Sequence, residues 1–96
     1  MSVLNVVALI TAKPGSEELV RSSLAALGVE TLKEEGCGKY ELFASAATPG
    51  TFVTIEEWAS QADFDGHLAS PHIAAALGAT ADALTTPPAI HPLLPA

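Results

Sequence analysis

Positively charged residues are scarce in this chain of 96 residues. Four Lys and Arg stand against 11 Asp and Glu, which gives a formal net charge of −7 with the three His neutral. Proteins that hold nucleic acid by its phosphates need clustered Lys and Arg. The composition therefore excludes simple electrostatic binding of DNA or RNA.

Cysteine is also scarce, and long apolar runs are missing. The single cysteine, Cys37, has no partner for an intramolecular disulfide. No stretch approaches the roughly 18 apolar residues that a transmembrane helix needs. The opening residues Met1–Asn5 lack the basic segment of a signal peptide. We therefore expect a cytoplasmic protein with no membrane contact.

Cofactor-binding motifs are absent as well. Gly36 and Gly38 lack the third glycine and the following helix of a dinucleotide-binding loop. His67 and His72 are five residues apart, across Ser70-Pro71, and so do not share one helical face at the i, i+4 spacing of a metal pair. We expect no metal, flavin or nicotinamide cofactor.

Apolar residues, by contrast, make up 49% of the chain and charged residues only 16%. This length and composition predict one folded domain over residues 1–96. A domain of this size buries only roughly 60 to 65% of its unfolded surface. Such an apolar chain is therefore expected to bury further surface against a second copy of itself.

Hydrophobic periodicity predicts the first four elements. Residues 3–12 are apolar on both alternating faces, which is typical of a strand buried on two sides. A helix with N-cap Ser16 follows and ends at 36–38. Period-two alternation predicts strands at 39–44 and 51–58, joined by a turn at 48–50. The buried stripe of the helix is predicted to be Val20, Leu24, Leu27 and Thr31.

The last third of the chain predicts two helical pieces and an edge strand. The first piece covers residues 61–69, and the second begins at Ser70-Pro71 with Ser as N-cap and Pro in the first position. The tail forms a strand only at a sheet edge, because Pro92 and Pro95 remove hydrogen-bond donors. The order of elements predicts an α+β protein, the ferredoxin-like βαββαβ fold with a four-stranded antiparallel sheet. Helices cover one face of such a sheet, so we expect a homodimer in which two sheets pack together.

A spaced set of short motifs extends over nearly the whole chain, from Val3 to about Ile90. It consists of Ala8, Lys13-Pro14-Gly15, Glu35-Gly36-Cys37, Tyr40-Glu41-Leu42, Phe52, Glu56-Glu57-Trp58, His67 and Ser70-Pro71-His72. The ordered set resembles the antibiotic biosynthesis monooxygenase domain, including the quinol monooxygenases, of the dimeric α+β barrel superfamily. The resemblance implies a dimer whose sheets form a barrel, with a small cavity between sheet and helices in each subunit. It also implies oxidation of hydroquinone- or anthrone-like compounds by O2 without metal, flavin or haem.

The third strand supplies the candidate substrate contacts. Thr54, Glu56 and Trp58 alternate along it, so their side chains leave the same face. An aromatic plane beside polar groups suits a flat aromatic ligand, and we expect Trp58 to form the floor of the cavity. Tyr40 and Phe52 are further candidate contacts. The alternative for Trp58 is ordinary core packing.

Two histidines are candidates for the catalytic base. An unperturbed pKa of about 6.5 suits proton removal at neutral pH, and a quinol must lose a proton before it gives an electron to O2. The sequence does not choose between His67 and His72, and each has the alternative of a helix-cap or surface role. The leading hypothesis is a cofactor-independent monooxygenase or quinol oxidase that acts on a small aromatic substrate with O2. Its rivals are a non-catalytic barrel, which binds a small apolar metabolite or is purely structural, and a lactone isomerase of the same superfamily.

Overall fold

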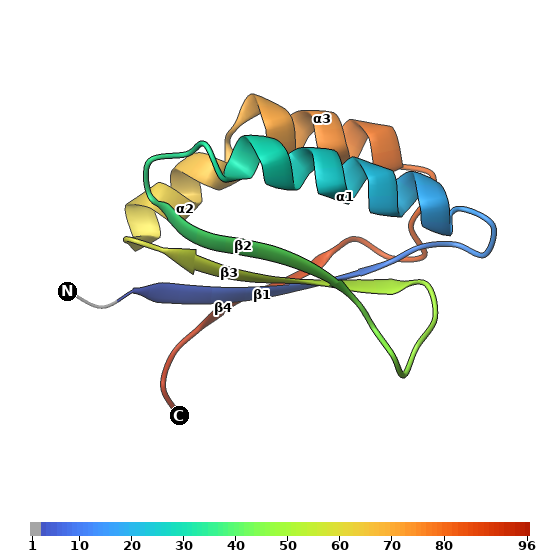
Figure 1. Cartoon of the computed structure of the whole chain (residues 1–96), viewed down its shortest axis with the longest axis horizontal. Helices are drawn as coiled ribbons and strands as arrows, with labels where there is room; N and C mark the ends of the chain where they lie inside the picture. The colour runs from blue at the N-terminus through green and yellow to red at the C-terminus, as the bar shows by residue number, and fades with distance from the viewer. Residues whose placement is uncertain (1–2) are drawn as a thin grey trace.

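The computed structural model describes residues 3–96. A four-stranded antiparallel sheet carries three helices on one of its faces (Figure 1). The predicted α+β class and βαββαβ order are confirmed, with the second helical region divided in two. The elements are β1 (Leu4–Thr11), α1 (Glu17–Thr31), β2 (Cys37–Ala44), β3 (Thr51–Trp58), α2 (Gln61–Leu68), α3 (Pro71–Thr80) and β4 (Ala89–Leu93).

The strand order in the sheet is β2-β3-β1-β4. The proline-containing β4 therefore lies at an edge, as predicted. Pro92 has no backbone N–H, and the open side of an edge strand has no neighbouring strand to which an N–H would donate. Ala8 on β1 lies opposite Thr54 of β3 and Ile90 of β4. In the turn between β2 and β3, Gly50 has a φ of 85°, a conformation that favours glycine and confirms the predicted hairpin.

The helices begin largely as predicted, but α1 ends early. Ser70 caps α3 by accepting a hydrogen bond from the Ile73 N–H, and Pro71 occupies the first helical position. Ser16 precedes α1 without such a side-chain bond. The last residue of α1 is Thr31, so the expected end at 36–38 is wrong, and residues 32–36 form a loop. None of the helices within residues 3–96 has the length and apolar character needed to cross a membrane.

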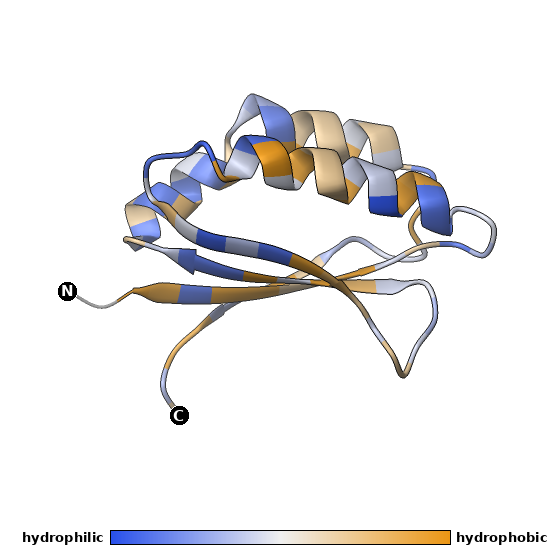
Figure 2. Ribbon diagram, in the orientation of Figure 1, coloured by the Kyte–Doolittle hydropathy of each residue, from blue (hydrophilic) through white to orange (hydrophobic). Residues whose placement is uncertain are grey.

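The core lies between the helices and one face of the sheet. The predicted stripe of α1 is the buried one, and it packs on Ala8 and Ile10 of β1. Figure 2 shows apolar residues along much of β1, on a sheet whose other face carries no helix. On that open face Leu9, Phe43 and Ile55 are 41%, 47% and 38% exposed. One face of β1 therefore has no covering element among residues 3–96.

Candidate functional site

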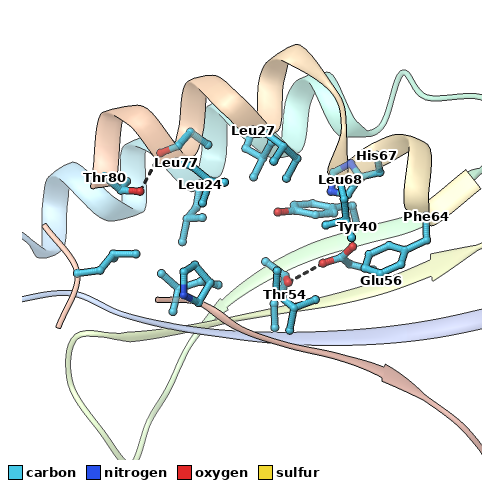
Figure 3. A pocket seen from close by; sticks show the side chains of 17 residues that line it. Leu24, Leu27, Tyr40, Thr54, Glu56, Phe64, His67, Leu68, Leu77 and Thr80 are labelled. Atoms are coloured by element: carbon cyan, nitrogen blue, oxygen red, sulfur yellow. Dashed lines mark hydrogen bonds between the residues drawn. The ribbon is translucent and has the colours of Figure 1, made fainter. Parts of the chain in front are cut away.

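A cavity of about 60 Å³ lies between the sheet and the helices. Four of its five polar side chains lie toward the end beneath α2, whereas leucines of α1 and α3 surround much of the rest (Figure 3). The fifth, Thr80, lies at the other end and donates its hydroxyl hydrogen to the Ala76 carbonyl. Among residues 3–96, no Lys or Arg lines it. The cavity therefore suits an uncharged ligand with an apolar body and polar groups at one end. The polar side chains at that end are Tyr40, Thr54, Glu56 and His67.

Glu56 is the buried centre of a hydrogen-bond network on β3. Its Oε2 accepts from the Thr54 hydroxyl at 2.8 Å, and its Oε1 accepts from the Trp58 indole N–H at 2.9 Å. The three residues alternate along the strand and so leave the same face, which confirms the predicted arrangement. Two donors stabilise a buried carboxylate that has no ion-pair partner within residues 3–96.

Trp58 does not form the floor of the cavity, so that expectation is wrong. The residue is 0% exposed, packs with Val6 and Phe64, and is not among the residues that line the cavity. Its ring lies 4.6 Å from that of His67, centroid to centroid. The indole therefore acts on the cavity through its contacts with Glu56 and His67.

Phe52 is also misplaced as a candidate contact. It lies on β3 opposite Ile10, and both residues belong to the main hydrophobic core together with Val20 of α1. The cavity does not reach it. Period-two alternation correctly predicted its face, but the packing of α1 on that part of the sheet fills the space around its ring.

His67, in the last turn of α2, is held from several sides. It is 2% exposed, and its Nδ1 lies 2.6 Å from Oε2 of Glu34. Because a carboxylate only accepts, Nδ1 donates this bond, so in the neutral ring the lone pair is on Nε2. Nε2 has no hydrogen-bond partner among residues 3–96. Every side-chain nitrogen or oxygen there that is fully buried does have a partner, so Nε2 is not fully buried. Nε2 is therefore open to the cavity that the ring lines.

His72 lies on the other side of the same carboxylate. Its Nε2 is 2.7 Å from Glu34 Oε2, and its ring borders a surface groove between α1 and α3 rather than the cavity. The two histidines do not share one helical face, as predicted, since they lie on α2 and α3. The turn at Ser70 nevertheless brings both rings to Glu34, so the spacing does not exclude a metal pair. Within residues 3–96, Glu34, His67 and His72 form a group able to hold one metal ion, with ligand atoms within 4.8 Å of one another.

Sequence reasoning missed Glu34 as a functional residue. It lies in the loop that follows α1, a segment that the sequence assigned to the helix. The available signal was the pair of carboxylates, Glu34 and Glu35, just before Gly36. Nothing in that signal indicates which carboxylate turns inward.

Tyr40 extends the polar end of the cavity from β2. It lies opposite Glu56 in the strand register, and its hydroxyl points into the cavity (Figure 3). Its ring packs closely under α1, where a Cβ added to Gly28 would lie 3.3 Å from it. Burial raises the pKa of the Tyr40 phenol, and the charge of Glu56 raises it further. The hydroxyl therefore keeps its hydrogen and can donate it to a ligand oxygen.

Comparison with known proteins gives consistent results. The family model described as antibiotic biosynthesis monooxygenase matches residues 3–79. "Putative monooxygenase Rv0793" of Mycobacterium tuberculosis is 32% identical over 94 residues, which cover 98% of this chain and 92% of that protein. "Probable quinol monooxygenase YgiN" of Escherichia coli K12 is 34% identical over 83 residues, covering 76% and 80%.

Solved structures agree with the sequence matches. The structure of Rv0793 has a TM-score of 0.90 at 32% identity and covers 99% of this chain and 96% of its own. PA3566 from Pseudomonas aeruginosa has a TM-score of 0.91 at 27% identity, with coverages of 100% and 96%.

Proposed function

The chain belongs to the antibiotic biosynthesis monooxygenase family, and from this premise we propose that it oxidises a small hydroquinone- or anthrone-like aromatic compound with O2, without a cofactor. The observation that carries the proposal is the orientation of His67, whose free Nε2 opens into an apolar cavity while Nδ1 is tied to Glu34. The names of the relatives support oxidation as the reaction type.

Proton removal is the step assigned to His67. The aromatic ring lies among the leucines of α1 and α3, with its acidic C–H or O–H group toward Nε2. The proton moves to Nε2, and the carboxylate of Glu34 at Nδ1 stabilises the imidazolium that forms. With an anthrone-like substrate the carbanion gives its electrons to O2 and forms a C–O bond. The peroxide that results takes the proton back from His67, and its O–O bond then breaks. The outer oxygen leaves with the second ring hydrogen as water, and a carbonyl remains on the ring.

The other polar groups of the cavity hold the substrate. The Tyr40 hydroxyl donates to the substrate oxygen on which negative charge develops, and the Glu56 carboxylate accepts from a substrate hydroxyl. Thr54 lines the cavity beside Glu56 and keeps that carboxylate oriented. Trp58 and His72 do not reach the cavity and act as positioning residues, through Glu56 and Glu34 respectively.

Oxygen uptake with a panel of hydroquinones and anthrones tests this function. With ¹⁸O2, we expect one labelled oxygen atom in the product carbonyl and the other in water, as a monooxygenase requires. Uptake that yields hydrogen peroxide and an unlabelled quinone would identify an oxidase instead. Binding of the aromatic compound without oxygen uptake would favour the non-catalytic barrel.

We also propose that the protein is a homodimer formed through the open face of the sheet. One row of side chains across the four strands consists of Phe43, Val53, Leu9 and Ala89. The next row contains Ile55 and Val7. A contiguous apolar surface of this kind is typical of a protein–protein interface. A second copy would cover it sheet to sheet.

The mass in solution checks the dimer. Size-exclusion chromatography with light scattering is expected to give about twice the chain mass of 9.8 kDa. Ile55→Glu should shift the mass to that of the monomer, since it places an unpaired carboxylate in the apolar contact and opposite Glu41. Val29→Glu, on the exposed surface of α1, is the matched control and should remain dimeric. A monomeric wild-type protein would contradict the proposal.

A further inference from the structure

Three side chains from three separate segments meet at one carboxylate oxygen. Glu34 comes from the loop after α1, His67 from the end of α2 and His72 from the first turn of α3. Oε2 of Glu34 lies 2.6 Å from His67 Nδ1 and 2.7 Å from His72 Nε2. From this arrangement we propose that Glu34, His67 and His72 bind a divalent transition-metal ion such as Zn²⁺, and that the bound ion inhibits the enzyme.

The donor set fits such an ion. Two imidazole nitrogens with one carboxylate oxygen, leaving a position open to water, form a recurrent set for Zn²⁺ and its neighbours in the first transition row. When the two facing nitrogens donate to Glu34, their hydrogens lie between the three ligand atoms. Moving each hydrogen to the other nitrogen of its ring frees both lone pairs without net loss of a proton. Both lone pairs then face Oε2 of Glu34, and an ion between the three atoms requires that oxygen to turn aside.

The geometry requires moderate adjustments. Ligands about 2.1 Å from a tetrahedral ion are roughly 3.4 Å apart, so each nitrogen must move less than about 1 Å away from the Glu34 oxygen. The two nitrogens, which lie within 4.8 Å of each other, must settle at that same separation. The ring of His67 is held by Trp58 and Phe64. The side chains of Glu34 and His72 are 21% and 20% exposed and face the surface, which gives them room to turn and gives an ion a route of access.

The electrostatics also favour a cation. Among residues 3–96, the ion-pair partners of Glu34 are the two histidines and no Lys or Arg. The negative charge of the carboxylate is therefore available to an ion when the rings are neutral. The chain as a whole carries a formal charge of −7, which attracts cations further.

The inhibitory effect rests on the proposed function of His67. An ion on Nδ1 forces the ring hydrogen onto Nε2, the nitrogen that is open to the cavity. Nε2 then donates a hydrogen bond and has no lone pair with which to accept a substrate proton. The ion reaches Nδ1 from the surface side, so it leaves the cavity itself unblocked.

Cobalt absorption tests the site independently of activity. Co²⁺ added to untagged, chelator-treated protein is expected to produce visible absorption bands that saturate at one ion per chain and disappear when Zn²⁺ displaces it. Zn²⁺ should also raise the melting temperature. His72→Ala should weaken Zn²⁺ binding by more than about 100-fold. Loss of a residue that only supports a ligand typically weakens metal binding by about 10- to 100-fold, so a larger loss identifies His72 as a ligand. His91→Ala, which alters a histidine on the opposite face of the sheet from the three ligands, should bind like the wild type.

The metal site and its inhibitory effect are contradicted by different results. The site is overturned if no stoichiometric Co²⁺ complex forms, or if His72→Ala binds Zn²⁺ as tightly as the wild type. Inhibition is overturned if stoichiometric Zn²⁺ leaves oxygen uptake by active protein unchanged. A protein that binds the ion but oxidises none of the aromatic compounds refutes the proposed function and, with it, the inhibitory half, while the site stands.

Discussion

His67→Asn is expected to lower the turnover of the aromatic substrate about 10²- to 10⁴-fold, the usual contribution of a general base. The asparagine amide can still donate to Glu34, which limits the disturbance of the loop after α1. It offers no basic nitrogen to the cavity. The rate loss should therefore appear in kcat, measured as oxygen uptake at saturating substrate, in a variant that remains folded and dimeric.

Two histidine variants sharpen this result. His72→Asn should cause a smaller loss, because His72 contacts Glu34 but does not line the cavity. His91→Asn changes a histidine of the open sheet face, away from the cavity, and should leave the rate unchanged in a variant that remains dimeric. Wild-type turnover in His67→Asn, or an equal loss in His72→Asn, would show that His67 is not the base.

Trp58→Ala is expected to lower the free energy of unfolding by about 3 to 5 kcal/mol, a large part of the roughly 5 to 15 kcal/mol of a typical domain. The ring is fully buried against Val6 and Phe64, so truncation leaves a cavity in the core. It also removes the indole donor from Glu56. Urea unfolding at fixed protein concentration should show a lower midpoint with an unchanged slope.

Trp58→Phe separates packing from hydrogen bonding. It keeps an aromatic ring but leaves Oε1 of Glu56 without its donor, which typically costs about 1 to 3 kcal/mol. Its loss of stability should therefore be smaller than that of Trp58→Ala. If Trp58→Ala instead unfolds like the wild type and only loses substrate affinity, the indole contacts substrate and the burial argument fails.

Local patterns predicted much of the fold because they act over a few residues. Period-two alternation correctly bounded β3 at 51–58 and correctly placed Thr54, Glu56 and Trp58 on one face. Ser70-Pro71 correctly marked the start of α3, since Ser caps a helix and Pro suits its first position. The prolines of the tail placed β4 at an edge. The element order and the fold class follow from such signals.

Local patterns did not predict which of these side chains line the cavity and which are buried in the core. Alternation indicates that Trp58 and Phe52 turn toward the helices, but not whether a helix then covers them. The packing of Phe64 and Val6 around Trp58, and of α1 around Phe52, excludes both from the cavity. Tyr40 shares their face and does line it. These outcomes depend on how the helices lie on the sheet.

The sequence by itself determined the class of fold, the order of its elements and which residues of a strand share a face. Only the tertiary structure decided that His67 faces the cavity, that His72 does not, and that both bind Glu34. The two contacts to Glu34 join residues 33 and 38 positions apart. They depend on the early end of α1 and on the turn between α2 and α3. No local periodicity predicts these contacts, because they arise from the packing of separate segments on a common sheet.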